Sequence, residues 1–213
     1  MSQVKLIWST PNGDNLVAYM ARVSNPDNQD NTATSPRLIK YLLDNAHWSP
    51  LEMVSCCIEI TTWRDIARQI LRHRSFSFQE FSQRYANVDK LPELPARECR
   101  LQDVKNRQNS VSVGDDNVLP YMWRDEQDEI MTIARTAYQN AIDAGIAKEV
   151  ARVLLPEGLT PSRMYMSGNL RSWVHYLQVR MGNGTQKEHA EIAHMIRDIL
   201  AAEFPMIIEA AGV

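Results

Sequence analysis

The spacing of apolar and polar residues along the chain predicts several helices and a few strands. Apolar and polar side chains alternate from Val54 to Thr61, which indicates a half-buried strand. Apolar residues recur at helical spacing over 121–144, and Gly145 is placed to end that helix. The same pattern predicts strands over 4–9 and 163–167, and helices over 15–23, 35–45, 63–71, 147–155, 169–179 and 185–202.

Helix-start signals and one irregular stretch complete the predicted fold. Ser35 before Pro36 indicates an N-cap with proline in the first turn, and Thr185 with Glu188 has the spacing of a capping box. Residues 86–117 are polar, lack periodicity and predict a long surface loop. We therefore expect an α+β fold, a single domain over 1–213, with a small, mostly antiparallel sheet packed with helices, one of them long.

Composition and charge exclude several classes of protein. The 213 residues suit one domain, and a net charge of −3 argues against a general nucleic-acid coat or a basic membrane-surface protein. Without a membrane-spanning apolar run or a signal-peptide pattern, we expect a cytoplasmic chain. Among the 23 basic residues, 17 are Arg, the side chain suited to bidentate recognition of phosphate and carboxylate.

Five of these arginines fall between Trp63 and Tyr85, in a segment without lysine. Arg64, Arg68 and Arg72 recur every four residues and so share one helical face. Aromatic side chains follow among Arg74, Ser82 and Arg84; they are Phe76, Phe78, Phe81 and Tyr85. This mixture suits a phosphate-bearing heteroaromatic ligand or single-stranded nucleic acid, and a merely solvated basic face is the alternative.

A second polar segment begins at Arg152 and continues in the predicted helix from Asn169. On a helical wheel, Asn169, Ser172, Tyr176 and Arg180 share one face. The apolar residues form a largely separate side, and the remaining polar residues, Arg171, His175 and Gln178, point elsewhere. An ordinary core helix is the alternative interpretation.

Nucleophile and metal chemistry find little support in the sequence. Cys56 and Cys57 lie in the predicted strand, where they are expected to be core side chains, and only Cys57 beside Glu59 offers a weak case for a reactive thiol. The five histidines show no zinc-ligand spacing, so we expect no metal site.

Several motifs of the chain, taken together, resemble the flavin-dependent thymidylate synthase family. Arg72-His73-Arg74, seven residues and then Ser82 is similar to that family's RHR-x7-S signature. Further matching elements occur in the family's order, namely His47–Glu52, Ala67–Gln69, Ala151-Arg152 with Leu155-Pro156, Asn169-x-Arg171-Ser172, and Arg180-x5-Gln186-x-Glu188. The resemblance covers roughly residues 14–200.

The resemblance implies a reaction and its cofactors. Members of this family methylate dUMP to dTMP, with methylenetetrahydrofolate as carbon donor, FAD as redox carrier and NADPH as reductant. They form homotetramers whose active sites are shared between subunits. The residues that would contact FAD are Ser49, Arg72, His73, Arg74, Glu80, Asn169, Leu170, Arg171 and His175. Those that would bind dUMP are Gln69, Ile70, Leu71, Arg72, Glu80, Phe81, Ser82, Gln83, Arg84, Arg152 and Arg180. Arg180 would be catalytic, because the matching arginine sits at the uracil and favours ionisation of its ring nitrogen.

Two other functions remain open on the sequence. A flavin-dependent hydroxymethylase of pyrimidine nucleotides would use the same residues. A non-catalytic module that binds single-stranded nucleic acid would use only the arginine and aromatic segment, although the acidic net charge argues against it.

Overall fold

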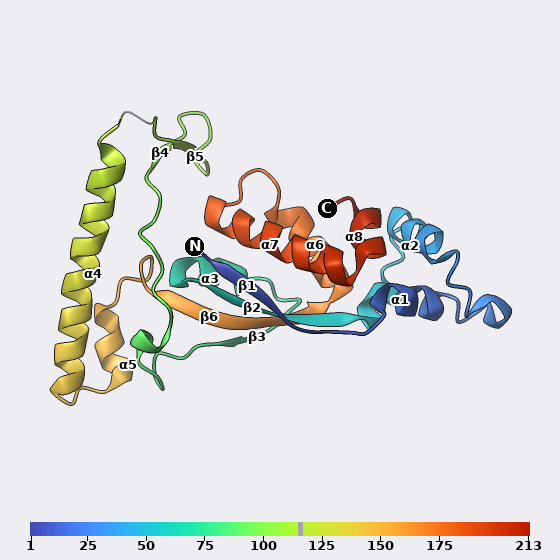
Figure 1. The fold of residues 1–213 in the computed structure, drawn as a ribbon, viewed down its shortest axis with the longest axis horizontal. Helices are drawn as coiled ribbons and strands as arrows, with labels where there is room; N and C mark the ends of the chain where they lie inside the picture. Colours follow the sequence, from blue (N-terminus) through green and yellow to red (C-terminus); the bar gives the residue numbers. More distant parts are fainter. Residues whose placement is uncertain (115–116) are drawn as a thin grey trace. The chain divides into compact units, whose positions relative to one another are not determined.

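The computed structural model describes residues 1–114 and 117–213, which form an α+β fold (Figure 1). Four strands form the main sheet in the order β1-β2-β6-β3, and they are β1 (Gln3–Ser9), β2 (Ser55–Trp63), β6 (Pro161–Asn169) and β3 (Ser77–Glu80). A second, two-stranded sheet pairs β4 (Arg100–Gln102) antiparallel with β5 (Ser110–Ser112).

The described α-helices are α1 (Gly13–Ala21), α2 (Ser35–Asp44), α3 (Arg64–Ile70), α4 (Leu119–Asp143), α5 (Lys148–Ala151), α6 (Leu170–Arg180), α7 (Lys187–Glu203) and α8 (Pro205–Ala211). Short 3-10 turns occur at η1 (Pro26–Asn28), η2 (Ser49–Met53), η3 (Val88–Lys90) and η4 (Arg152–Leu154). The helix α4 has 25 residues, which confirms the predicted long helix. None of the helices in the described residues is long and apolar enough to cross a membrane.

The central strands run antiparallel, as predicted. At one end of the β2–β6 pair the Leu170 N–H donates to the Val54 carbonyl at 2.9 Å, and at the other end the Arg64 N–H donates to Thr160 at 2.9 Å. Residue numbers therefore rise along β2 as they fall along β6, which defines an antiparallel pair. The two strands come from segments far apart in the sequence, so their pairing joins residues 55–63 to residues 161–169.

The predicted half-burial of the cysteine strand is wrong at Cys57 and Thr61, whereas Ser55 and Glu59 on the same face are partly exposed. Side chains on both faces of β2 are buried, including Cys57 at 7% and Thr61 at 5% exposure. The strand lies between β1 and β6, and the two polar-face positions that are buried, Cys57 and Thr61, carry small side chains.

The described residues divide into two compact units. The first, here called the α4 unit, comprises Met1–Gln3, Thr61–Arg72 and Glu80–Met164. The second, the α6 unit, comprises Val4–Ile60, His73–Gln79 and Tyr165–Val213.

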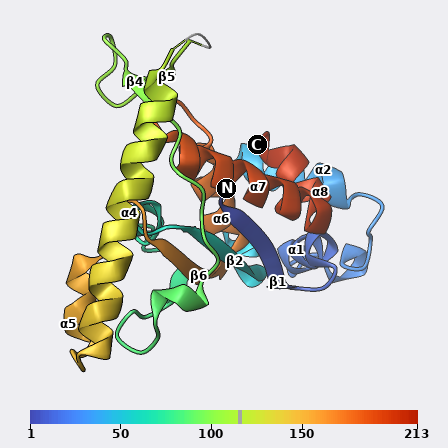
Figure 2. The ribbon, with the colours of Figure 1, turned by 60° about the vertical axis from the view of Figure 1, so that its left-hand side comes forward.

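In the α6 unit, α6, α7 and α8 pack beside one another (Figure 2). Trp173, Tyr176 and Phe204 are fully buried there. The carboxylate of Asp14 accepts the Met206 N–H at 2.8 Å and the Ile207 N–H at 3.3 Å, so α1 supplies the cap of α8. This cap joins residues nearly two hundred positions apart, and α8 itself was not predicted from the sequence.

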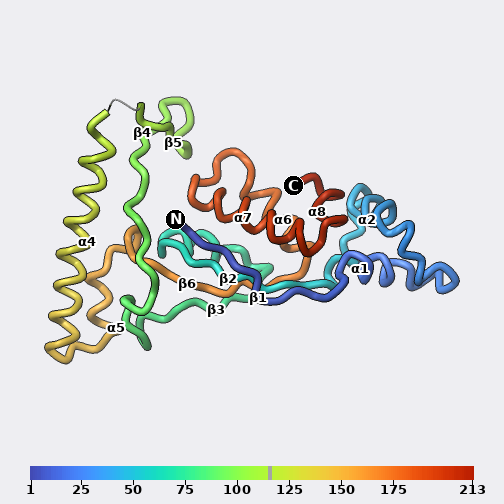
Figure 3. The backbone as a smooth tube through the Cα atoms, viewed as in Figure 1, coloured from blue at the N-terminus to red at the C-terminus, as the bar shows by residue number. Residues whose placement is uncertain are grey.

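In the α4 unit, α4 packs against α5 and η4 (Figure 3). A small core of Val88, Tyr138 and Ala151 joins them, together with Ala141, Ile142 and Leu155. The predicted helix over 147–155 ends at Ala151 and continues as the 3-10 turn η4. Leu155 then takes extended geometry, because the proline at position 156 disfavours α-helical geometry in the residue before it.

Other local differences arise where pairing partners are distant or signals are short. The stretch 86–117 contains η3 and the β4–β5 hairpin within its described part, and β3 was also not predicted. The N-cap of α7 is Gln186 rather than Thr185, whose hydroxyl donates instead to the Val179 carbonyl at 3.3 Å. The predicted strand over 163–167 is confirmed and extends to 161–169.

Candidate active site

A pocket of about 550 Å³ opens in the α6 unit beside α6. It is lined by Trp48, Glu52, Ser75, Asn169, Arg171, Ser172, His175 and Gln178. Arg171, His175 and Gln178 follow one another at helical spacing, so they form one face of α6. These are the three polar residues that the helical wheel placed away from the Asn169–Arg180 face.

The start of α6 shapes this pocket. The Asn169 side chain accepts the Ser172 N–H at 2.9 Å and so acts as the N-cap. Arg171 is paired with Glu52 of η2, which leaves its guanidinium at the pocket wall. The Ser172 hydroxyl donates to the Ser75 carbonyl at 3.3 Å and ties the segment after His73 to the helix.

Only some of the residues that the resemblance assigns to flavin contacts line this pocket. Asn169, Arg171 and His175 line the pocket, whereas Leu170 is fully buried and offers only backbone atoms. Ser49 and Arg74 are exposed in the α6 unit. The pocket is lined by an arginine, three amide or imidazole side chains and the indole of Trp48. These groups suit an anionic aromatic cofactor, so the lining fits part of a flavin dinucleotide.

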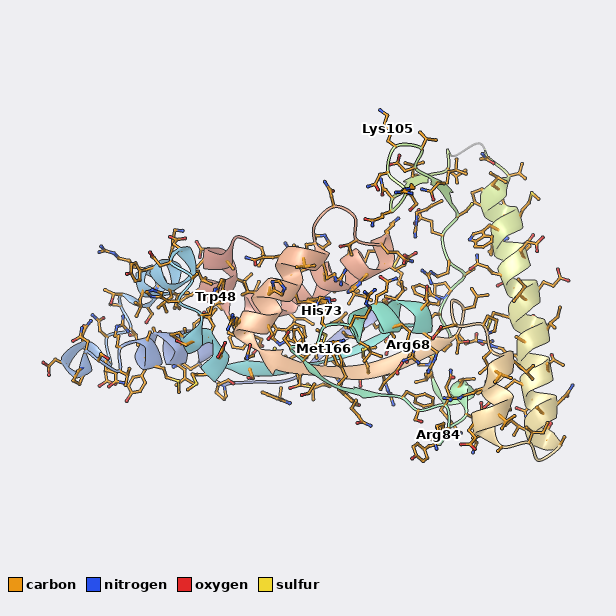
Figure 4. All side chains as sticks on the ribbon, turned by 180° about the vertical axis from the view of Figure 1, so that it is seen from behind. Trp48, Arg68, His73, Arg84, Lys105 and Met166 are labelled. Carbon is orange, nitrogen blue, oxygen red and sulfur yellow. The ribbon has the colours of Figure 1, made fainter. Side chains whose placement is uncertain are left out.

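A buried polar cluster surrounds His73, which Figure 4 labels in the α6 unit. The Arg180 Nε–H donates to His73 Nε2 at 2.7 Å. Tyr176, fully buried, meets the His73 ring edge-on with the ring centroids 4.9 Å apart. Its hydroxyl lies 3.1 Å from His189 Nε2. Tyr176 and Arg180 thus share one face of α6, as the helical wheel predicted. That face points largely into the protein interior.

Both histidines of the cluster are held neutral. Burial, and then the positive charge of Arg180, lowers the pKa of His73 to about 4 and that of His189 to about 3. Burial also raises the pKa of the Tyr176 hydroxyl. The cluster therefore carries one charge at neutral pH, on the Arg180 guanidinium.

In the α4 unit, Glu80 organises the arginines of α3. Arg68 Nη1 lies 3.1 Å from Glu80 Oε2, and the Ser162 hydroxyl donates to Glu80 Oε1 at 2.8 Å. Arg68 Nε also lies 3.0 Å from Glu157, and Arg64 lies 3.8 Å from Glu80. The sequence pattern left Arg64 and Arg68 without a role, and in the structure they hold these two carboxylates.

Two further arginines converge on Glu149 in the same unit. Arg84, labelled in Figure 4, lies with its Nε 3.4 Å from Glu149 Oε2, and Arg152 Nε donates to the Glu149 carbonyl at 3.3 Å. The Ser82 hydroxyl accepts the Arg84 N–H at 3.3 Å. Both arginine side chains thus contact Glu149, and the Ser82 hydroxyl contacts the backbone of Arg84. Arginine and serine side chains are groups that bind phosphate.

The remaining substrate residues expected from the resemblance differ in exposure. Ile70 is fully buried. Gln83 is 4% exposed, and within the described part of the chain its side-chain nitrogen has no hydrogen-bond partner. Leu71 and Phe81 are half-buried, and Arg72 is exposed. Gln69 lies on α3 and interacts with other residues of the protein. Ile70 can therefore contribute backbone atoms only.

The expected flavin and nucleotide sets fall largely in different units. Most flavin residues belong to the α6 unit, with Arg72 and Glu80 as exceptions. Every nucleotide residue except Arg180 belongs to the α4 unit. Sequence reasoning missed Trp48, Glu149 and the Tyr176–His189 pair, because no local pattern links these side chains to their partners.

Two of the three cysteines lie in the protein interior. Cys56 and Cys57 are buried, and burial raises the pKa of both thiols, as expected for core side chains. Within the residues that the structure describes, no group of three or more His, Cys, Asp or Glu side chains is arranged to hold a metal ion.

Comparison with known proteins identifies the family. The family described as thymidylate synthase complementing protein matches residues 5–206. The chain is 46% identical to a probable flavin-dependent thymidylate synthase of Paramecium bursaria Chlorella virus 1, over 92% of this chain and 89% of that protein. It is 45% identical to a flavin-dependent thymidylate synthase of Synechocystis sp., over 92% of this chain and 88% of that protein.

A solved structure agrees with these relatives. A UMP/dUMP methylase from Streptomyces cacaoi, crystallised with 5-Br dUMP, superposes with a TM-score of 0.84 and is 28% identical, covering 99% of this chain and 94% of that one. The order of strands and helices, the matched sequence elements and the full-length relatives agree, and the chain belongs to the family of flavin-dependent thymidylate synthases.

Proposed function

We propose that this chain methylates dUMP to dTMP, with FAD as the redox carrier, methylenetetrahydrofolate as the carbon donor and NADPH as the reductant. Family membership over residues 5–206 supports the reaction class. The observation that carries the assignment to this chain is the pair of donor sets, one lined by Arg171 in the α6 unit and one formed by Arg84 and Arg152 in the α4 unit.

The pocket beside α6 is the proposed site for part of the flavin. Arg171 would neutralise negative charge on the dinucleotide, while Asn169 and His175 supply hydrogen-bonding groups. When bound, the flavin supplies the transfer of reducing equivalents, which no amino-acid side chain provides. The chain's own contribution is to hold and orient it, and Trp48 gives the pocket an apolar wall.

The arginines around Glu149 are the proposed site for the dUMP phosphate. A nucleotide phosphate carries about two negative charges, which two guanidiniums and the Ser82 hydroxyl would bind. Arg84 and Glu149 are each more than half exposed, so their present ion pair is weak and a phosphate would compete for it readily.

Arg180 is the proposed catalytic group at the pyrimidine. Carbon 5 of uracil is a weak nucleophile until electron density is pushed into the ring. A guanidinium that favours loss of the proton from the ring nitrogen stabilises the anion that develops, an effect usually worth about 3 kcal/mol. This route needs no protein nucleophile, which agrees with the buried cysteines.

We further propose a single functional domain over residues 1–213, a cytoplasmic location and a homotetramer with shared active sites. These statements are supported by the sequence resemblance. Size-exclusion chromatography with light scattering measures the oligomer directly, and a monomer that turns over would contradict the shared-site proposal.

The enzyme proposal is tested with the purified protein. Its visible spectrum should show bound flavin, and a colourless protein that fails to bind added FAD would contradict it. Mixing the holoprotein with dUMP, methylenetetrahydrofolate and NADPH should give dTMP, identified by mass, whereas a hydroxymethyl product would assign the alternative reaction. UMP is assayed alongside, because the structural neighbour is described as a UMP/dUMP methylase.

A single substitution tests the role of Arg180. Arg180→Ala should keep FAD, since the pocket beside α6 is lined by other residues, and should lower kcat by at least about a hundredfold. The matched control is Arg163→Ala, a change at an exposed arginine of β6 that has no place in either donor set. Near-normal dTMP formation by Arg180→Ala would remove its catalytic assignment.

A further inference from the structure

The Tyr176–His189 pair has no part in the binding sites described above, yet it is fully buried against His73. Its hydroxyl-to-nitrogen distance is 3.1 Å, and both side chains have no exposed surface. The His73 ring meets Tyr176 at 72° and His189 at 89°, with centroid distances of 4.9 and 6.3 Å. The two rings therefore form a wall, contributed by α6 and α7, along His73.

The hydrogen bond from Arg180 defines the state of His73. A guanidinium has only donors, so the ring nitrogen that faces Arg180 Nε at 2.7 Å must carry a lone pair. The single proton of the neutral ring is then on Nδ1. A rotation of the ring by half a turn would place a carbon at Arg180 and break the bond.

The same bond fixes the guanidinium. With Nε held by His73, the terminal Nη1 and Nη2 groups form no other hydrogen bond or ion pair with the residues that the structure describes. Two parallel N–H donors match the adjacent oxygen and nitrogen acceptors on one edge of an ionised uracil ring. Swinging of Arg180 about its long side chain would lose this match, so its anchorage matters to the reaction.

We propose that Tyr176 and His189 are positioning residues for Arg180 that act through His73. The hydrogen bond between them holds the Tyr176 and His189 rings in place, and these rings pack against His73 and prevent its rotation. His73 in turn holds Arg180 Nε. The low pKa of His73, lowered by burial and then by the charges of Arg180 and His175, keeps the ring in the accepting form at neutral pH. This inference rests on the proposed role of Arg180 at the pyrimidine.

Kinetics of three variants test the inference. Tyr176→Phe removes only the hydroxyl, His189→Leu replaces the imidazole by an apolar side chain of similar size, and the third variant combines them. Each single change should lower kcat about tenfold while the KM for dUMP and the FAD affinity stay within about twofold, because small displacements of a catalytic group act on the transition state. The combined variant should lose little more than His189→Leu alone, since His189→Leu already breaks the hydrogen bond of the Tyr176 hydroxyl.

A matched control comes from the α4 unit. Tyr138 is also buried, and its hydroxyl has no hydrogen-bond partner among the residues that the structure describes, so Tyr138→Phe should leave kcat unchanged. If Tyr176→Phe and His189→Leu lower only the unfolding temperature and keep the wild-type kcat, the pair is structural and the inference is overturned.

A spectroscopic readout separates this inference from the proposed function. In holoprotein labelled with ¹⁵N-histidine, the His73 signals are assigned by their loss in His73→Gln. Wild-type protein should show one protonated and one unprotonated nitrogen on His73, and His189→Leu should show averaged signals. This measurement needs no turnover, so it decides the positioning of His73 even if dTMP formation fails. Unchanged His73 signals in His189→Leu would overturn the inference.

Discussion

Gly168 precedes the N-cap of α6, and substituting it gives a direct test of how the flavin pocket is supported. A Cβ added at Gly168 would lie 2.5 and 2.7 Å from two carbons of the Phe76 ring. Carbon atoms are in optimal contact at about 3.5–4.0 Å, so Gly168→Ala requires the ring to move by about 1 Å.

The surroundings of Phe76 oppose this movement. Phe76 is 8% exposed, and its ring centroid lies 4.6 Å from that of Trp173. Trp173 is fully buried and donates its indole N–H to the Gly168 carbonyl at 3.1 Å. Overpacking of such a site costs about 1–3 kcal/mol, and the reduced freedom of the unfolded chain returns about 0.4–1 kcal/mol. We therefore expect Gly168→Ala to lower the free energy of unfolding by about 1–2 kcal/mol.

Thermal unfolding of the FAD-free protein at fixed concentration measures this change. For a chain of this size, about 1 kcal/mol corresponds to about 2–4 °C in Tm. Gly158→Ala is the matched control, because its Cβ would meet nothing within 4 Å. Adding Phe76→Leu to Gly168→Ala should recover part of the loss by removing the clashing ring atoms. A Gly168→Ala protein as stable as wild type would refute the reasoning.

Three further predictions concern charge. Arg171→Ala removes the arginine that lines the pocket and should raise the Kd for FAD about tenfold or more in a fluorescence titration, with an unchanged Kd contradicting the pocket assignment. Glu80→Ala deprives two arginines and a serine of their shared partner and should destabilise the protein by about 2–3 kcal/mol in urea, more than Glu80→Gln does. Because the folded-state pKa values of His73 and His189, about 4 and about 3, lie below 6.5, the unfolded chain binds more protons. Stability should therefore fall as the pH drops from about 6.5 toward 4, and His189→Leu should make that fall shallower in urea unfolding at several pH values.

The sequence alone determined the elements whose pattern is local. The long helix α4, the strand around the cysteines and the helix that begins at Asn169 each follow from spacing and capping within a few residues. The arginine-rich motif, read as a resemblance, gave the family, which comparison confirmed. The sequence also singled out the four arginines on which the proposed sites rest, Arg84, Arg152, Arg171 and Arg180.

Only the tertiary structure decided which of those residues meet. His73 and Arg180 are 107 positions apart, and nothing in their local sequence shows that one accepts a hydrogen bond from the other. The burial of both faces of β2 and the wall formed by Tyr176 and His189 likewise depend on which segments pack together. Periodicity and capping act over a few residues along the chain, whereas sheet pairing and side-chain packing are set by contacts between distant segments, and the candidate site consists mostly of such contacts.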